Sequence, residues 1–429
     1  MKHLAYRILF IALAALLGAQ EPAPSYLTLD QAKAEALRNH PAYAAAQLKE
    51  LLAKESLKQA RAAYFPTANG YVDAVDTAWD NTRILAGGIN NPSVYDRVGE
   101  GIAVTQLITD FGRTKNLSSG AKSEARAAAQ GAESSREQVL LNVEANYIAT
   151  LQANAVLKVA KQTLSTRQLV VDQVKALAQN QLKSELDVSF AQVALEQAEL
   201  LVQTSQGEAD GAMASLGAAL GRKETSTFIL EDDRQEIAPP ADLNALVANA
   251  LKTRPDLLDL QYKYDAAQST ASAAKDANYP TLAAVGVLGN SFAEDSHLPD
   301  KYAAAGVQLS IPIFEGGAML SRQHEAEIQA RVAAEALREA EDNVVRDVRV
   351  ALVAYQTALQ RLSTTRQLLK HASQAFDLAR ARYKAGSSSV VELSDAQLNQ
   401  TFAAIANANA EYDTQLKASL LDYQTGSIQ

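Results

Sequence analysis

Apolar residues along the chain follow a helical period over unusually long stretches. Residues 112–178 and 316–384 contain no proline, little glycine beyond their first residues, and stripes of Leu, Val and Ile among many alanines. Each stretch predicts one continuous helix of roughly 100 Å, at ~1.5 Å per residue, which is far longer than a globular helix. Polar turns then lead into shorter helices predicted over 187–220 and 391–425. Wide polar faces suit helices with water on two sides, and they also suit an ordinary solvated coiled coil. Periodicity alone does not distinguish these two arrangements.

Strand-like alternation precedes each long helix. In the clearest case Val307, Leu309 and Ile311 alternate with small or polar residues, and Ile102 and Val104 hold the matching places earlier in the chain. A period of two is typical of β-strands. We expect strands at about 67–80, 97–109, 281–291 and 302–312.

The chain consists of two similar halves. Ala36–Pro41 returns as Ala250–Pro255, and Leu186–Gln192 returns as Val391–Gln397. Self-similarity of this kind indicates a tandem duplication. The expected organisation is a first repeat over 21–221, a joining segment over 222–240 and a second repeat over 241–429.

Each repeat is predicted to be mainly α with β, in the order helix, β-hairpin, long helix, turn, helix. The first helix of the first repeat is expected over 29–63, with Thr28 or Asp30 as its cap and Pro66 beyond its end. Its length and that of the last helix together match the long helix, so two shorter helices are expected to pack end to end along it.

Residues 1–20 have the layout of a secretory signal peptide. Lys2 and Arg7 precede an apolar run from Ile8 to Leu17, which small residues follow. A membrane anchor is the alternative, although the run is shorter than the about 20 residues that a spanning helix needs. No later segment is apolar for long enough to cross a bilayer as a helix, so the mature chain is soluble or spans by strands.

The amino-acid composition excludes several kinds of chemical site. Cysteine is absent, which excludes disulfides and thiolate metal sites, and the net charge of −9 argues against nucleic acid and for cationic or neutral cargo. The five histidines are scattered, and we found no phosphate-binding glycine loop and no nucleophile elbow. We therefore expect no enzyme activity, no cofactor and no metal site.

Aromatic residues cluster at both ends of the predicted strands. Tyr64 and Tyr279 stand at one end, and Trp79 and Tyr302 stand toward the loops. Two aromatic girdles suit a membrane-spanning barrel, whereas an aromatic-edged soluble sheet is the alternative. Four strands are too few for a closed barrel, and an open edge cannot face lipid, so a membrane barrel would have to be shared among chains. Two chains would supply eight strands and three would supply twelve.

A Gly-Ser turn separates the last two helices. Gly386 can close the long helix, the serines after it can cap the next helix, and Glu392 and Asp395 stand three residues apart near its start. Taken alone, the two acids are charges that favour the positive end of a helix.

Several motifs together resemble the TolC-type outer-membrane efflux protein family. They are Asn39-His40-Pro41, Thr253-Arg254-Pro255, Tyr279-Pro280-Thr281, Ile311–Gly317, and Tyr383–Gly386 leading to Glu392–Gln397. The resemblance implies a homotrimer in the outer membrane with a periplasmic extension, in which a 12-stranded membrane β-barrel continues into a 12-helix α-barrel. It further implies a passive exit duct of a tripartite efflux or type I secretion system. The implied partners are a periplasmic adaptor, an inner-membrane pump of RND, ABC or MFS type, and outer-membrane lipid.

The resemblance also assigns residues. Glu392, Asp395 and Asp187 would form the tunnel constriction, although Phe190 stands where the first repeat would need a second acid. Tyr383 and Asp187 would latch the closed tip, with Ser388 in place of a basic residue of some members. Adaptor-docking turns are expected at Gln181, Leu182, Lys183 and Ser184, and at Gly386, Ser387, Ser388 and Ser389. Residues 222–240 would form an equatorial segment or, alternatively, an exposed linker. The rival function is a non-channel periplasmic coiled-coil scaffold or adaptor.

Overall fold

The structure is a computed structural model that describes residues 26–75, 97–222, 228–232, 242–293 and 300–428. The expected signal peptide at 1–20, residues 76–80 of the first expected strand, and parts of 222–240 lie outside these residues. The described helices are α2 (Leu29–Asn39), α3 (Pro41–Ala62), α4 (Arg113–Gln179), α5 (Glu185–Ala219), α6 (Leu243–Thr253), α7 (Pro255–Asp276), α8 (Ala318–Lys384) and α9 (Val390–Gln424).

The helix lengths repeat between the halves. Helices of 11, 22, 67 and 35 residues occur in this order in the first half and again in the second. The duplication seen in the sequence is therefore also a duplication of the described helices.

The helix expected over 29–63 is two helices, α2 and α3. His40, between them, has φ −75° and ψ 120°, which is extended backbone. The cause is Pro41, because a proline ring disfavours helical backbone at the preceding residue. The same break separates α6 from α7 at Arg254-Pro255. Thr28, rather than Asp30, caps α2, and it forms a capping box with Gln31.

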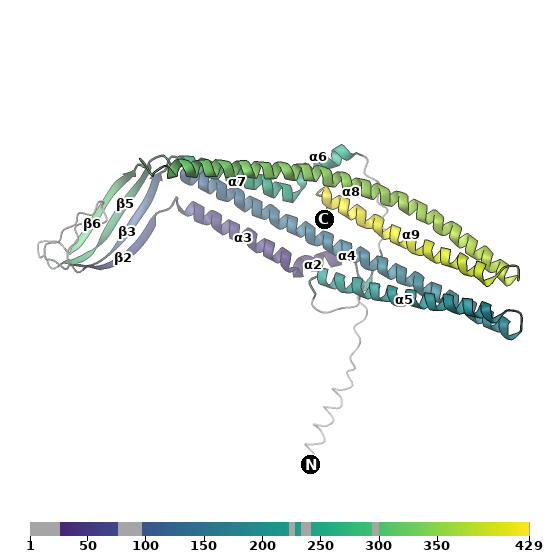
Figure 1. Ribbon diagram of the computed structural model, residues 1–429. Helices are drawn as coiled ribbons and strands as arrows, with labels where there is room; N and C mark the ends of the chain where they lie inside the picture. The colour runs from purple at the N-terminus through teal and green to yellow at the C-terminus, as the bar shows by residue number, and fades with distance from the viewer. Residues whose placement is uncertain (1–25, 76–96, 223–227, 233–241, 294–299, 429) are drawn as a thin grey trace, which may run out of the picture. The chain divides into compact units, whose positions relative to one another are not determined.

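The four long strands form one antiparallel sheet in the order β2 (Thr67–Val75), β3 (Arg97–Thr109), β5 (Thr281–Ala293) and β6 (Lys301–Ser310) (Figure 1). The central pair, β3 with β5, joins the two repeats. β6 ends at Ser310, short of the expected 312, because Pro312 has no N–H to donate to a neighbouring strand.

The described part of the joining segment is anchored. β4 (Ile229–Leu230) pairs in parallel with β1 (Tyr26–Leu27), and the buried Tyr147 hydroxyl lies 2.8 Å from Leu27 O and 2.7 Å from Glu231 O. Phe228 is buried in the same cluster. Residues 228–232 are therefore held against α4 and β1, although Ile229, Glu231 and Asp232 are exposed.

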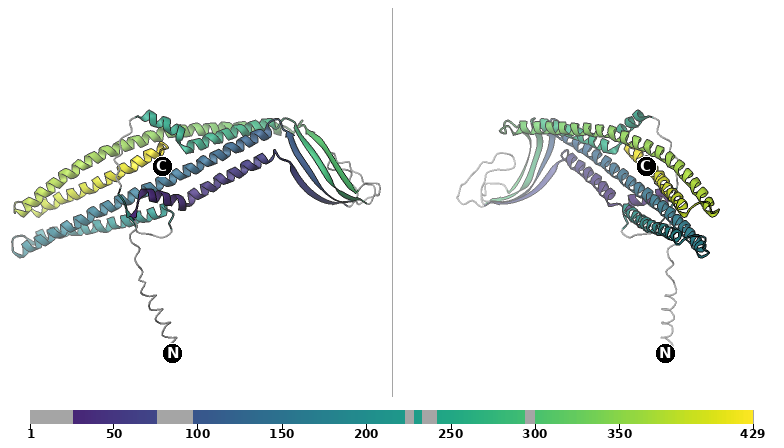
Figure 2. Two further views of the ribbon diagram at one scale, coloured as in Figure 1. Left: turned by 180° about the vertical axis from the view of Figure 1, so that it is seen from behind. Right: turned by 45° about the vertical axis from the view of Figure 1, so that its right-hand side comes forward.

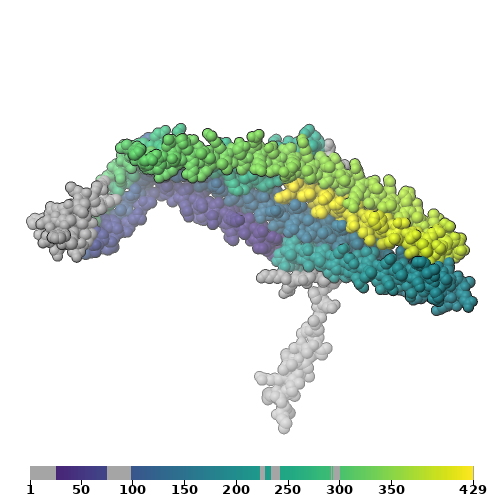
Figure 3. Space-filling view, in the orientation of Figure 1, coloured from purple at the N-terminus to yellow at the C-terminus, as the bar shows by residue number. Residues whose placement is uncertain are grey.

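The chain divides into two compact units, and α4 and α8 contribute residues to both. One unit contains residues 45–134 and 251–345, including the four-stranded sheet. The other contains residues 1–44, 135–250 and 346–429, in which α4 pairs with α5 and α8 with α9 (Figure 2). Figure 3 shows the yellow surface of α9 lying along the green surface of α8. None of the described helices is both long and apolar enough to cross a membrane.

Candidate functional site at the helix turns

Both helix turns of the chain are packed into one cluster. Val171 and Val174 of α4 and Ala191 of α5 are buried with Phe376 and Tyr383 of α8, and α9 adds Val390 and Leu393. Apolar side chains from all four helices therefore hold the α4–α5 turn beside the α8–α9 turn.

The first turn uses a strained residue and a capping box. Gln181 has φ 59°, the left-handed conformation that the second turn gives to Gly386 at φ 74°. Ser184 caps α5, and Asp187 Oδ2 accepts hydrogen bonds from Ser184 N at 3.1 Å and from Ser184 Oγ at 2.9 Å. These hydrogen bonds lower the pKa of Asp187. Asp187 is thus the acidic partner of Ser184 in the capping box of α5.

The second turn is closed by serines. Ser389 caps α9 and its Oγ accepts from Glu392 N at 3.2 Å, while Ser387 Oγ donates to Arg382 O at 3.1 Å. Lys183, Gly386 and Ser387 are exposed or partly exposed, so both turns present polar surface, and Leu182 adds an exposed apolar side chain to the first turn.

The two acids near the start of α9 lie beside arginines of the same chain. Glu392 Oε1 is 2.9 Å from Arg382 Nη1, and both side chains are largely exposed. Asp395 is exposed, and its charge acts on Arg167, which is only 6% exposed. Sequence reasoning identified the acids and missed both arginines.

The Tyr383 ring, rather than its hydroxyl, makes the contact between the turns. Lys183 Nζ lies 5.0 Å from the centre of the ring, within cation–π range. Tyr383 Oη and Ser388 Oγ are buried without a hydrogen-bond partner among the described residues. The Tyr383–Asp187 hydrogen bond expected for the latch is therefore not formed in this structure. Burial, and then the charge of Asp187, raises the pKa of Tyr383.

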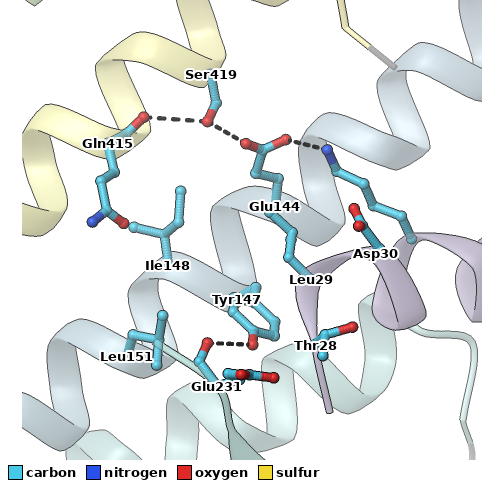
Figure 4. Close-up of a pocket in the computed structure, with 11 residues that line it drawn as sticks. Thr28, Leu29, Asp30, Glu144, Tyr147, Ile148, Leu151, Glu231, Gln415 and Ser419 are labelled. Carbon is cyan, nitrogen blue, oxygen red and sulfur yellow. Dashed lines mark hydrogen bonds and ion pairs between the residues drawn. The ribbon is translucent and has the colours of Figure 1, made fainter. Parts of the chain in front are cut away.

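A separate pocket of about 390 Å³ lies between α2, α4 and α9 (Figure 4). Lys33 Nζ is 3.1 Å from Glu144 Oε2, and Ser419 Oγ donates to Glu144 Oε1 at 2.5 Å. These polar groups satisfy one another. Nowhere in the described residues do three or more potential metal ligands gather.

Comparison with known proteins identifies similar chains. The sequence profile named outer membrane efflux protein matches residues 33–222 and 246–426. Fusaric acid resistance protein FusA of Burkholderia cepacia is 27% identical over 272 residues, 62% of this chain, and the match spans about half (51%) of FusA. Outer membrane protein OprJ of Pseudomonas aeruginosa is 27% identical over 348 residues, covering 78% of this chain and 70% of OprJ. A crystal structure of CusC has a TM-score of 0.79 at 20% identity, covering 93% of this chain and 92% of the other, which shows a shared fold.

Proposed function

Because the chain belongs to the outer membrane efflux protein family, we propose that it is the passive exit duct for an inner-membrane pump and a periplasmic adaptor. The family, the fold class and the outer-membrane location predicted from the sequence are confirmed by this membership. The rival interpretation, a periplasmic coiled-coil scaffold, gains no support from any similar protein. Small molecules and secreted polypeptides both remain cargo candidates.

The sheet supports a duct assembled from several copies. β2 and β6 each have a neighbour on one side only among the described strands. Val72, Leu288 and Val307 are more than half exposed on this sheet, as expected for side chains that meet lipid. Unpaired strand edges in lipid would each leave amides without partners, so the edges of neighbouring copies pair. Three copies close a twelve-stranded barrel, as the family resemblance implies.

Helix α3 carries the argument for assembly. It is 22 residues long and none of its residues is buried. Leu48, Leu51 and Leu52 are exposed by 65%, 55% and 69%. Most of the stability of a protein helix comes from packing of its apolar face, so we assign these leucines an apolar partner outside their own chain. α3 leads into the edge strand β2 and α8 follows the edge strand β6, and Ile328 and Val332 of α8 are also exposed. The partner we assign to α3 is therefore α8 of the next copy.

The packed turns form the periplasmic entrance of the duct. Glu392, Asp395 and Asp187 constrict it, and Asp395 is exposed at this end. Carboxylates gathered around an axis favour cations. The latch is the contact of Lys183 with Tyr383, in which Lys183 supplies the basic group missing at Ser388.

The adaptor docks on the two turns. Gln181, Leu182, Lys183 and Ser184 line one turn, and Gly386, Ser387, Ser388 and Ser389 line the other. Leu182 is 69% exposed, and this fits a contact with a partner that buries it.

Membrane fractionation and conductance test the proposal. The full chain, exported in a Gram-negative host, should sediment with the outer membrane, require detergent, and run as an assembly of three copies. In planar bilayers the purified assembly should give discrete conductance steps. A chain found in the soluble periplasmic fraction, with no conductance, would contradict the duct and favour the scaffold.

A further inference from the structure

The two acids of the proposed entrance are held by arginines in different ways. Arg382 and Glu392 are both largely exposed, with 59% and 43% of their side chains accessible. An exposed ion pair of this kind is weak and is screened by salt. Arg382 therefore offsets the charge of Glu392 only loosely.

Arg167 is fixed. It lies on α4 of the first repeat and is 6% exposed. Its Nη1 donates to Ser394 Oγ at 2.7 Å, and its Nη2 donates to Ser394 O at 3.1 Å. A planar guanidinium that donates to two atoms of one residue has little freedom to turn. The arginine is thereby held at Ser394, the residue that precedes Asp395 in the sequence.

Arg167 and Asp395 interact electrostatically. Burial lowers the pKa of the guanidinium, and the carboxylate of Asp395 opposes that shift. An arginine nevertheless keeps its proton in proteins, so Arg167 carries a full positive charge that acts on Asp395.

We propose that Arg167 is a positioning and selectivity-determining residue of the duct entrance, which fixes the first turns of α9 and offsets the charge of Asp395. This inference rests on the proposed function. In an assembly of three copies, the ring of acids would then be backed by three buried arginines from the first repeats. The entrance would be less cation-selective than its carboxylates alone suggest.

The test is the cation-over-anion permeability ratio of the purified assembly in planar bilayers, measured in a KCl gradient. Arg167→Gln should raise this ratio roughly 3-fold or more, the change expected if the lost positive charge acted on a passing cation from about 6 Å in water. Arg167→Lys keeps the charge and should restore the ratio toward that of the unchanged chain. Arg366→Gln is the matched control, since Arg366 is an exposed arginine roughly 27 Å along α8 from Lys384, well beyond the screening length.

A second substitution separates selectivity from a merely structural role. Asp395→Asn should lower the ratio, and the effect of Arg167→Gln should shrink in the Asp395→Asn background. An intact Arg167→Gln assembly with an unchanged ratio would overturn the proposal, as would a changed ratio in Arg167→Lys.

Two other outcomes, a variant that does not assemble and an unchanged chain that does not conduct, are told apart as follows. If Arg167→Gln does not assemble, Arg167→Lys decides: it should keep the ratio and lose thermal stability, because it lacks the forked donors. If the unchanged chain does not conduct, the proposed function fails. The charge coupling of Arg167 with Asp395 is then measured by a double-mutant cycle in thermal unfolding, where zero coupling would overturn the inference.

Discussion

Arg222 donates two hydrogen bonds to the carboxylate of Glu35. Its Nε donates to Oε1, and its Nη2 donates to Oε2 at 2.7 Å. The guanidinium also lies 4.4 Å from the centre of the Phe228 ring. This arginine therefore ties α2 both to the end of the first repeat and to the anchored segment beside β4. Mainly because of the hydrogen bonds from Arg222, the pKa of Glu35 is lowered.

The Glu35–Arg222 pair should make stability depend on pH. A carboxyl with a lowered pKa in the folded state stabilises the fold above its unfolded pKa, and this stabilisation is lost as pH falls through the folded pKa. Glu35→Gln should therefore cost about 1 kcal/mol at pH 7, and the deficit should shrink as pH falls below the unfolded pKa of Glu35. Thermal unfolding of the unchanged protein and of Glu35→Gln, in detergent across this pH range, measures the difference in their stability. An equal deficit across the whole range would contradict the assignment.

Loss of the Lys183–Tyr383 contact should open the entrance. Lys183→Gln removes the cation and Tyr383→Leu removes the ring, so each should raise the open probability in planar bilayers by roughly 2- to 30-fold, the range of a cation–π contact. The double variant should add little to either one. Lys175→Gln, at an exposed lysine of α4, is the control for the lost charge.

Tyr383→Phe separates two kinds of latch. It keeps the ring and removes a hydroxyl that has no partner among the described residues, so it should open the entrance much less than Tyr383→Leu does. Equal opening by the two variants would point to a hydroxyl latch with Asp187 instead.

Substitution by alanine should disrupt the sheet at Gly289 and be tolerated at Gly286. A Cβ on Gly289 would collide with the backbone oxygen of Glu100 and would lie 2.7 Å from the Tyr302 hydroxyl. The same atom on Gly286 would meet only Ala304 O at 3.9 Å. Gly289→Ala should thus reduce the yield of detergent-resistant assembly severely, while Gly286→Ala should leave it intact. Equal yields from the two variants would contradict the described register.

The exposed leucines of α3 should be needed for assembly more than for folding of the chain. Leu52→Glu places a charge on the face left open for a neighbouring copy, and it should shift the protein from trimer to monomer in detergent. Circular dichroism should retain the helical signal. Gln47→Glu adds the same charge at an exposed polar residue and should not dissociate the trimer. Dissociation by both variants would show that charge alone is responsible.

Sequence reasoning identified the long helices because their period is sustained. α4, α5, α8 and α9 begin and end within two residues of the expected bounds. The break at His40 was missed, although Pro41 was visible, because the helical pattern resumes directly after it. Strand alternation identified β3 and β6 but says nothing about which strands become neighbours. Arg167 was missed because Ser394 is 227 residues away in the sequence.

The pairing of β3 with β5 also sets an order of events in biogenesis. Gly101 of β3 is paired in register with Gly289 of β5, so the partner of the first repeat's inner strand is made much later. At about 5–20 residues per second, the ribosome needs roughly 10 to 40 s to cover this interval. During that time β3 has an unsatisfied edge that any other extended chain could occupy. The first repeat is therefore exposed to aggregation through this edge of β3 until the second repeat has been synthesised.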